Sequence, residues 1–403
     1  MAYDLLDGVR VVELSLYAFA PSAAAVLADW GADVIKVVPP KLADPMMGTP
    51  IAGLPQKDVG VAFMWELLNR GKRSIGIDVS HPDGRAVLLE LVGEADVFIT
   101  NLLPGARRRY GIDAEDLHAV KPTLVYARAS AHGADGPERD AGGYDHTDFW
   151  ARSGIGHAAS QVSDEFVPQP GPAMGDLASG ASMAGAIAAA LFRRERTGRG
   201  AVVDVSLLST AMWVGAPAVL AAQLYGVDTI PRMRHQDLPN PLVAAYVTRD
   251  GRQLYLSGIQ MENHFENFCD VVDRPDLLAD ERFATGAGRL ANRAELIAVL
   301  DELFATRDLD DWVVALRGLT TPWTVIQTAA EAGVDAQVVA NGYVVTIASD
   351  IEYPVVASPA QFDGVRPAAT RAPGHGEHTD EILAELGRSA EQILELKAAD
   401  AVL

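Results

Sequence analysis

The amino-acid sequence predicts an α/β protein built from two domains. At 403 residues the chain is long for one hydrophobic core, because single cores stop growing at roughly 250–300 residues. Over the first half, short apolar runs rich in β-branched residues alternate with helical patterns, which favours parallel strands joined by helices. The composition, 49% hydrophobic and 22% charged residues, is that of a well-buried globular protein.

The first expected unit is a strand, a helix and a second strand over Val9–Leu14, Pro21–Trp30 and Ala32–Val38. Pro21 is acceptable in a first helical turn and Gly31 ends the helix, so the short joins imply parallel strands. The alternation continues over Ser74–Val79, Asp83–Gly93, Val97–Thr100, Leu124–Arg128, Ala178–Ala190 and Val202–Leu207. Pro39–Asp58 is expected to form a long loop. This alternation is typical of nucleotide-binding sheets.

A different pattern begins near residue 225. Tyr225–Pro241 is rich in proline and is expected to be a linker, and Asp250-Gly251 marks a tight hairpin turn. Further elements are expected over Tyr246–Thr248, Gln253–Ser257, His264–Val272, Arg293–Phe304, Asp308–Leu316, Pro322–Thr328, Gly342–Ile347, Thr379–Gly387 and Ala390–Ala398. We therefore assign a large domain to residues 1–224, a linker and small α+β domain to 225–340, and a return linker with C-terminal helices packing on the large domain to 341–403.

Charge and cysteine content limit the possible partners and compartment. The net charge of −21 argues against nucleic-acid binding, which needs a basic surface. A single cysteine, Cys269, allows no internal disulfide and fits a reducing cytoplasm. Residues 1–15 lack the pattern of a signal peptide. The longest apolar run, Ala211–Leu224, is 14 residues against the ~20 that cross a bilayer. We expect a cytoplasmic protein that does not enter a membrane.

Asp176 stands at the start of the helix expected from Ala178 to Ala190, whose residues are almost all small. An aspartate at a helix start caps unpaired backbone N–H groups, and the helix dipole favours its ionised form. Most aspartates placed this way are only caps. The small neighbours leave open space above this one, so its carboxylate is also a candidate nucleophile.

The sequence contains few common functional motifs. The pattern G-x-G-x-x-A occurs at Gly154 and at Gly286, but neither copy follows a clear strand. There is no Walker loop, and no G-x-S-x-G elbow. His375 and His378 are spaced for one helical face, but a metal site wants three or four ligands, so no metal site is expected. Basic residues gather at Arg70–Arg73, Arg107–Arg109 and Arg193–Arg199, and those beside turns are candidates for holding phosphates.

Short segments over nearly the whole chain occur in a recognisable order: Leu6–Leu14, Leu27–Val37, Asn69–Ile75, Ala95–Gly105, Gly143–Asp145, Gly175–Asp176, Gly198–Gly200, Val203–Leu207 and Gly374–Thr379. Together they resemble the class III (CaiB/BaiF-type) coenzyme A transferases. The resemblance implies a Rossmann-like large domain, a small domain on long linkers, and an interlocked homodimer. It also implies transfer of coenzyme A from an acyl-CoA to a free carboxylic acid, with Asp176 as the nucleophile and no tightly bound cofactor.

The resemblance also implies a set of contacts to coenzyme A. Asn101 and Arg109 match family positions that contact it, and Lys72 and Arg73 lie in the matching basic turn. The remaining candidates for substrate binding are Ala18, Phe19, Gly143, Tyr144 and Gly175. Gly175 would contribute a backbone N–H donor to the oxyanion of the reaction.

Departures from the family pattern bear on the substrate. Ala20 replaces a family glycine, and Ser257–Gln260 stands where formyl-CoA transferases carry a glycine-rich loop. Formyl and oxalyl substrates are therefore disfavoured, and Phe149–Gly154 favours larger acids such as carnitine-type, aryl-lactate or bile acids.

Three other functions stay open. A related α-methylacyl-CoA racemase would need a histidine where this chain has Tyr144 and a glutamate where it has Gln260. His146 would serve only after a shift of register. A dinucleotide oxidoreductase wants a glycine fingerprint after the first strand, and Ser15–Ala20 contains no glycine. The third is a catalytically idle protein that binds coenzyme A.

Overall fold

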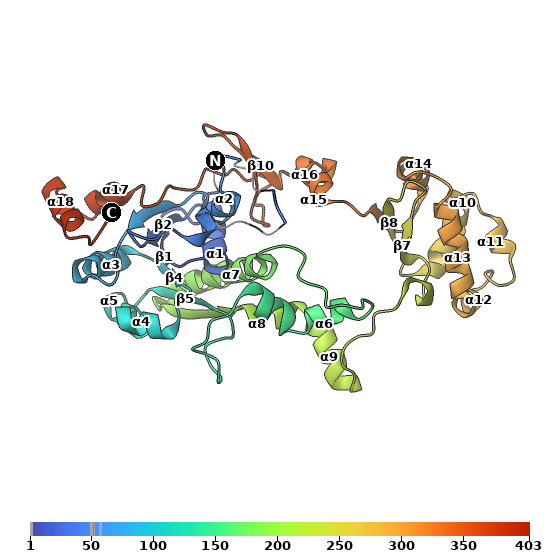
Figure 1. Ribbon diagram of the computed structural model, residues 1–403, viewed down its shortest axis with the longest axis horizontal. Helices are drawn as coiled ribbons and strands as arrows, with labels where there is room; N and C mark the ends of the chain where they lie inside the picture. Colours follow the sequence, from blue (N-terminus) through green and yellow to red (C-terminus); the bar gives the residue numbers. More distant parts are fainter. Residues whose placement is uncertain (1–2, 49–50, 52, 56–58) are drawn as a thin grey trace. The chain divides into compact units, whose positions relative to one another are not determined.

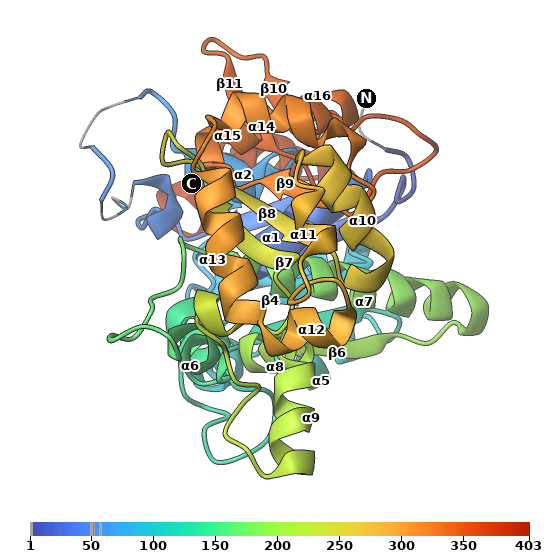
Figure 2. The same ribbon diagram turned by 90° about the vertical axis from the view of Figure 1, so that its right-hand side faces the viewer.

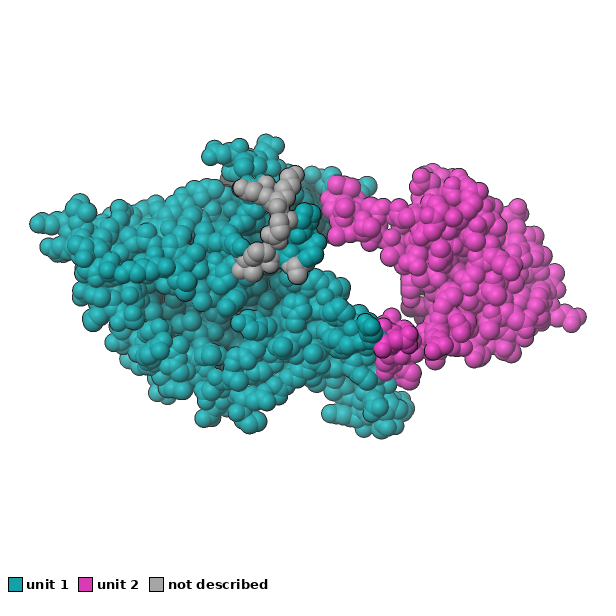
Figure 3. Space-filling model, in the orientation of Figure 1, with its two compact units in different colours: residues 1–160, 165–230, 336–403 teal, residues 161–164, 231–335 magenta. Residues whose placement is uncertain are grey.

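The computed structural model describes residues 3–48, 51, 53–55 and 59–403. The chain divides into two compact units, coloured separately in Figure 3. The first comprises residues 1–160, 165–230 and 336–403, and the second residues 161–164 and 231–335. The sequence predicts that the small domain begins at residue 225 and ends at residue 340, and in the structure its main segment runs from residue 231 to residue 335.

A six-stranded parallel sheet forms the centre of the first unit. Its strands are β1 (Arg10–Leu14), β2 (Asp33–Val38), β3 (Arg73–Gly76), β4 (Val97–Thr100), β5 (Val125–Ser130) and β6 (Ala201–Ser206). The strand order is β3-β2-β1-β4-β5-β6, which is the order of doubly wound nucleotide-binding sheets. The order reverses between β1 and β4, which pair in parallel from Val11 opposite Val97.

Helices cover both faces of this sheet because the strand residues alternate between two apolar clusters. One cluster joins strand residues such as Val11 and Val125 to α1 (Phe19–Asp29), α7 (Met174–Thr197) and α8 (Leu207–Val214). The other joins residues such as Val12 and Tyr126 to α3 (Pro82–Glu94), α5 (Ala114–Val120), α17 (Thr379–Glu385) and α18 (Ala390–Ala398). Figure 1 shows this layered arrangement.

Shorter elements complete the first unit. They are η1 (Pro45–Met47), α2 (Phe63–Asn69), α4 (Pro104–Tyr110), the π-helix η2 (Asp145–Ala151), α6 (Ile155–Ser160), α9 (Ala216–Tyr225), α16 (Ala336–Asn341), β10 (Val344–Ile347) and β11 (Tyr353–Val356). The loop expected over Pro39–Asp58 includes η1, and its residues 49–50, 52 and 56–58 lie outside the described residues.

Helix α7 crosses α1 at close range because small residues line the contact. A side chain at Gly180 would overlap Ser22 Oγ, so glycine is required there. By length and composition α7 is long and apolar enough to cross a membrane. In this fold its inner face, including Gly180, Met183 and Ile187, is buried in the core.

A cluster of fully buried charges lies at the ends of the first strands. Glu13 on β1 accepts hydrogen bonds from Lys36 Nζ at 2.9 Å and from Lys72 Nζ at 2.6 Å. Burial alone would raise the pKa of Glu13, but the two lysines outweigh it and lower that pKa to about 2. Lys36 Nζ also binds Ser15 O, and Lys72 Nζ binds Pro21 O. The cluster therefore fixes both ends of the loop between β1 and α1.

The second unit has its own apolar core. An antiparallel sheet of β7 (Val243–Val247), β8 (Gln253–Ser257) and β9 (Trp323–Val325) packs against helices, as Figure 2 shows. The helical elements are η3 (His235–Asp237), α10 (Met261–Val271), α11 (Asp276–Ala279), α12 (Gly286–Ala291), α13 (Arg293–Phe304), α14 (Leu309–Ala315), η4 (Leu316–Gly318) and α15 (Ala329–Gly333).

Candidate active site

A pocket of about 460 Å³ lies in the first unit at the carboxyl ends of the parallel strands. Tyr17 and Phe19 reach it after β1, Asn101 after β4, Ser130 at the end of β5, and Asp176 from the first turn of α7. Open α/β sheets bind their ligands at this edge, where the strand order reverses. The fold therefore places the pocket where a ligand is expected.

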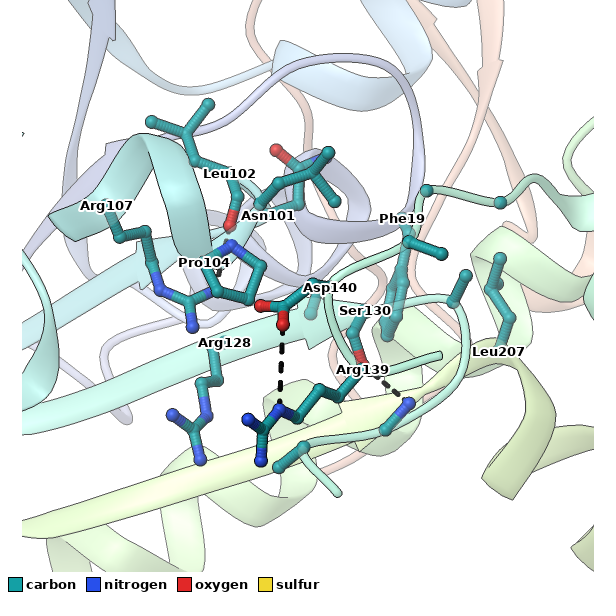
Figure 4. Close-up of a pocket in the computed structure, with 18 of the residues that line it drawn as sticks. Phe19, Asn101, Leu102, Pro104, Arg107, Arg128, Ser130, Arg139, Asp140 and Leu207 are labelled. Atoms are coloured by element: carbon teal, nitrogen blue, oxygen red, sulfur yellow. Dashed lines mark hydrogen bonds and ion pairs between the residues drawn. The ribbon is translucent and has the colours of Figure 1, made fainter. Parts of the chain in front are cut away.

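One side of the pocket is basic. Four arginines line it, and each is paired with a carboxylate: Arg107 with Asp113, Arg108 and Arg139 with Asp140, and Arg128 with Asp204. Figure 4 shows Arg107, Arg128 and Arg139 gathered on this side. The Arg108 and Arg139 pairs are 3.6 Å long and exposed, so they contribute little to stability. An anionic ligand can replace such partners.

The other side of the pocket is apolar. Figure 4 places Phe19 and Leu207 there. Tyr17 packs edge-on against Tyr144, with ring centroids 5.7 Å apart, and a hydrogen bond to Tyr144 raises the pKa of Tyr17. Tyr17 also has a φ of 65°, a backbone conformation that is uncommon for a residue with a side chain.

Asp176 is the third residue of α7, whose N-cap is Ala173, so the expectation that it caps the helix is wrong by three positions. Its side chain is half-buried. Within the described part of the chain nothing donates a hydrogen bond to its carboxylate. Burial, aided by the negative charge of Asp145, raises its pKa from 3.8 to about 7. The expectation of a stably ionised carboxylate is therefore wrong, because desolvation outweighs the helix dipole.

Asp145 on η2 is held against the start of α7. Its Oδ1 accepts a hydrogen bond from the Gly175 N–H at 3.0 Å, and its Oδ2 accepts one from Gln169 Nε2 at 2.6 Å. A side chain at Gly175 would overlap both Asp145 and the ring of Phe149. Because residue 175 is a glycine, Asp145 and Phe149 can approach the start of α7 this closely. The N–H of Gly175 already donates to Asp145. The expectation that it donates to the oxyanion does not agree with this geometry.

Of the ten site residues that the resemblance implies, five meet in the pocket: Phe19, Asn101, Gly143, Tyr144 and Asp176. Asn101 also fixes the loop after β1, since its amide donates to Leu16 O at 2.6 Å and accepts from Leu16 N at 3.1 Å. Ala18 is buried against Leu68 and Ala173 and does not line the pocket.

The structure places the basic turn elsewhere. Lys72 is buried in the Glu13 cluster and has no exposed side-chain surface. Arg73 binds Asp33 at 2.7 Å and Glu385 at 2.6 Å on the far edge of the sheet. Neither lines the pocket, so the interpretation of Lys72 and Arg73 as ligands of coenzyme A does not agree with this geometry. Runs of charged residues usually lie on a surface, so the sequence predicts an exposed Lys72 where the structure has a buried one.

The three consecutive arginines of α4 do not face the pocket in the way that the resemblance implies, which favoured Arg109. Arg107 and Arg108 line the pocket, whereas Arg109 stacks on Tyr110 and does not. The sequence does not indicate a role in the site for Arg128, Arg139 or Asp145. Arg128 could have been found, because it ends a predicted parallel strand and such ends meet at the ligand-binding edge.

The remaining candidate residues have other surroundings. His146 is exposed and does not line the pocket, and Phe149 and Trp150 are buried core residues. His378 Nδ1 accepts a hydrogen bond from Ser74 N at 3.2 Å. Across the residues that the structure describes, no group of three or more His, Cys, Asp or Glu is arranged to hold a metal.

The fold and the pocket together define an α/β protein of the nucleotide-binding type, whose pocket brings Asp176 together with four arginines. The sequence matches CoA-transferase family III over residues 6–379. It is 32% identical to (R)-2-hydroxy-4-methylpentanoate CoA-transferase of Clostridioides difficile, over 99% of each chain. It is 29% identical to cinnamoyl-CoA:phenyllactate CoA-transferase of Clostridium sporogenes, over 98% of this chain and 96% of that one.

The fold agrees with a solved structure of the same family. A CaiB/BaiF family protein from Brucella suis superimposes with a TM-score of 0.80 and 31% sequence identity, over 94% of this chain and 99% of that chain. The chain belongs to CoA-transferase family III and is an enzyme of the CoA-transferase class. Its substrates are therefore CoA thioesters and carboxylic acids.

Proposed function

We propose that the protein transfers coenzyme A from an acyl-CoA thioester to a free carboxylic acid through covalent intermediates on Asp176. The supporting observation is the Asp176 carboxylate itself, which has no hydrogen-bond donor within the described residues and a pKa raised to about 7 by burial. A carboxylate held without donors is more basic and more nucleophilic than a solvated one.

The reaction proceeds in balanced steps. An Asp176 oxygen attacks the thioester carbonyl carbon, the C–S bond breaks, and the CoA thiolate leaves behind an aspartyl anhydride. The thiolate then attacks the Asp176 carbonyl carbon and expels the first carboxylate, which leaves an aspartyl-CoA thioester. The acceptor carboxylate repeats the two steps in reverse order and departs as the new acyl-CoA. The transfer of coenzyme A between two carboxylates is thus divided into easier steps.

The two sides of the pocket suit the two ends of an acyl-CoA. The phosphates of coenzyme A carry the negative charge that Arg107, Arg108, Arg128 and Arg139 would bind. The thioester end is less polar and fits beside Phe19, Leu207 and Asp176. Coenzyme A acts here as a substrate and not as a resident cofactor.

We propose a 2-hydroxycarboxylic acid with an apolar side chain as the acceptor. The names of the Clostridioides difficile and Clostridium sporogenes relatives refer to acids of this kind. The aromatic rings of Tyr17, Phe19 and Tyr144 supply an apolar wall near Asp176, and the hydrogen-bonded pair of tyrosine hydroxyls keeps one O–H free to donate to the 2-hydroxyl group. Phe149 and Trp150 do not contribute to this wall, because both are buried in the core.

The test is an incubation with one acyl-CoA donor and a mixed pool of acids, followed by mass spectrometry of the acyl-CoA products. The proposal expects 2-hydroxy acids with branched or aromatic side chains to dominate the products, and short dicarboxylic acids to be poor. Intact-protein spectra of the quenched reaction should carry the added mass on the peptide with Asp176. An active protein without that adduct would contradict the covalent route.

We also propose that the protein works in the cytoplasm as a homodimer of the interlocked type. Large apolar side chains support association, since Trp213 on α8 and Tyr225 on α9 are each 81% exposed and Phe192 on α7 is 65% exposed. An interface between two chains would cover such side chains. Light scattering should give twice the chain mass, and Trp213→Glu should weaken the assembly. A monomeric, active parent protein would contradict it.

A further inference from the structure

We propose that Asp145 is a positioning residue for Asp176: it holds the first turn of α7 and adds a second carboxylate near the nucleophile. This inference rests on the proposed function, because it assigns a role within the same covalent reaction. It concerns a residue that does not line the pocket and does not touch the ligand space.

Asp145 is fixed by contacts on both sides. It is buried, with 4% of its surface exposed. Its Oδ1 accepts from the backbone N–H of Gly175, the residue immediately before the nucleophile, at 3.0 Å. Because η2 also carries Phe149 against Gly175, the start of α7 cannot shift without moving η2.

Gln169 holds the second oxygen of the Asp145 carboxylate. Gln169 Nε2 donates to Asp145 Oδ2 at 2.6 Å and to Gly171 O at 3.0 Å, so both N–H groups of the amide are used. Its Oε1 is buried without a partner in the described structure. Both oxygens of Asp145 therefore face donors, which is the arrangement of a carboxylate and not of a carboxylic acid.

The second carboxylate changes the energy of the reaction. In the free enzyme the negative charge of Asp145 disfavours the ionised form of Asp176. When Asp176 attacks the thioester, its charge leaves with the CoA thiolate, and it stays neutral in the anhydride and in the aspartyl-CoA thioester. The repulsion is thus present before acylation and absent in both covalent intermediates, so Asp145 favours their formation.

The other titratable groups around Asp176 are neutral tyrosines and paired ions. Tyr17 and Tyr144 lie in the pocket, and the arginines there are paired with Asp113, Asp140 and Asp204. Behind the pocket, Asp148 on the same π-helix binds His132 Nδ1 at 2.7 Å and the hydroxyl of Thr147 at 2.7 Å. Asp145 is the one charge whose electrostatic effect on Asp176 is resolved among the described groups.

The test compares Asp145→Asn with the matched variant Asp148→Asn, which also removes a buried carboxylate from η2. In Asp145→Asn the oxygen of the new amide can still accept from Gly175, and Gln169 can turn its unpartnered oxygen toward the new N–H groups. We expect the acid limb of the pH profile of kcat/KM to move down by about one pH unit in Asp145→Asn. It should stay in place in Asp148→Asn. An unmoved limb in Asp145→Asn, or equal shifts in both variants, would overturn the inference.

A charge-swap variant covers the case in which Asp145→Asn does not fold. In Asp145→Asn combined with Gln169→Glu, the hydrogen bond is kept with its polarity reversed, and the net charge is unchanged. Position 145 no longer carries a charge, so the acid limb should shift downward relative to the parent protein. No shift in the folded double variant would also overturn the inference. A parent protein that never carries an adduct on Asp176 would instead overturn the proposed function.

Discussion

The hydroxyl of Ser22 on α1 donates to the backbone carbonyl oxygen of Asp176 on α7 at 3.3 Å. The same hydroxyl lies 2.7 Å from Phe19 O, so one side chain joins the first turn of α1, where Phe19 lines the pocket, to the turn of α7 that carries Asp176. Gly180 leaves the space that this contact needs. The close crossing of α1 and α7 therefore sets where the Asp176 carboxylate lies relative to the pocket wall.

The first prediction concerns the nucleophile. Asp176→Ala should lower transfer by at least about four orders of magnitude, since loss of a covalent nucleophile is rarely compensated. It should leave the fold intact, because burial of the ionised Asp176 carboxylate opposes folding and its removal relieves that cost. Enzyme assay, acyl-CoA titration and thermal unfolding check these outcomes. A variant that unfolds, or that transfers at the parent rate, would remove Asp176 from the proposed role.

The second prediction concerns stability and pH. The pKa of Asp176 is about 7 in the folded protein against 3.8 ordinarily, so the parent loses stability as pH rises from about 4 through about 7. Asp176→Asn cannot ionise and should escape that loss. The variant should be more stable than the parent above about pH 8, by up to about 4 kcal/mol, and close to it below about pH 4. Urea unfolding at the two pH values measures the difference, and a gain confined to acid pH would have the wrong sign.

The third prediction tests the close contact at the start of α7. Gly175→Ala places a methyl group against Asp145 and Phe149, which should cost about 1–3 kcal/mol. The accompanying shift of the neighbouring nucleophile should lower kcat by about a hundredfold. Gly185→Ala is the control, because open space surrounds that position on the same helix. The control should gain up to about 1 kcal/mol with unchanged kcat, and similar behaviour of the two variants would contradict the contact.

The fourth prediction separates the arginines of α4. Arg108 lines the pocket and Arg109 does not, so Arg108→Ala should raise the KM for acyl-CoA about fivefold, the effect of roughly 1 kcal/mol. Arg109→Ala should raise it less. Arg199→Ala, which removes an exposed arginine outside the pocket, should leave it unchanged. Initial rates at low salt measure the KM values, and an effect of Arg109→Ala larger than that of Arg108→Ala would reverse the assignment.

Local pattern was sufficient for much of the fold. The predicted strand Val97–Thr100 and the helices Arg293–Phe304 and Ala390–Ala398 have the bounds found in the structure. These segments have strong periodicity and clear ends, and their apolar residues face a core. Asn101 came from the family resemblance, and the structure places it directly after the buried strand β4.

The parts of the site that the sequence did not reveal depend on contacts between distant segments. Asp145 meets Gly175 only because η2 packs on α7, and no local pattern encodes that meeting. The raised pKa of Asp176 comes first from burial, which is a property of the folded pocket. Which of Arg107, Arg108 and Arg109 faces the ligand depends on the rotation of α4, and Lys72 is internal only because Glu13 and Pro21 surround it.

The buried Glu13 cluster has a consequence for ionic strength. Lys36 and Lys72 have no exposed side-chain surface, so dissolved ions cannot reach them and added salt should leave the loop after β1 in place. The Arg108 and Arg139 pairs at the pocket are open to water and are screened within about 10 Å at 0.1 M salt. Changes in cellular salt would therefore adjust how firmly an anionic substrate is retained, without loosening the scaffold that aims the attacking carboxylate.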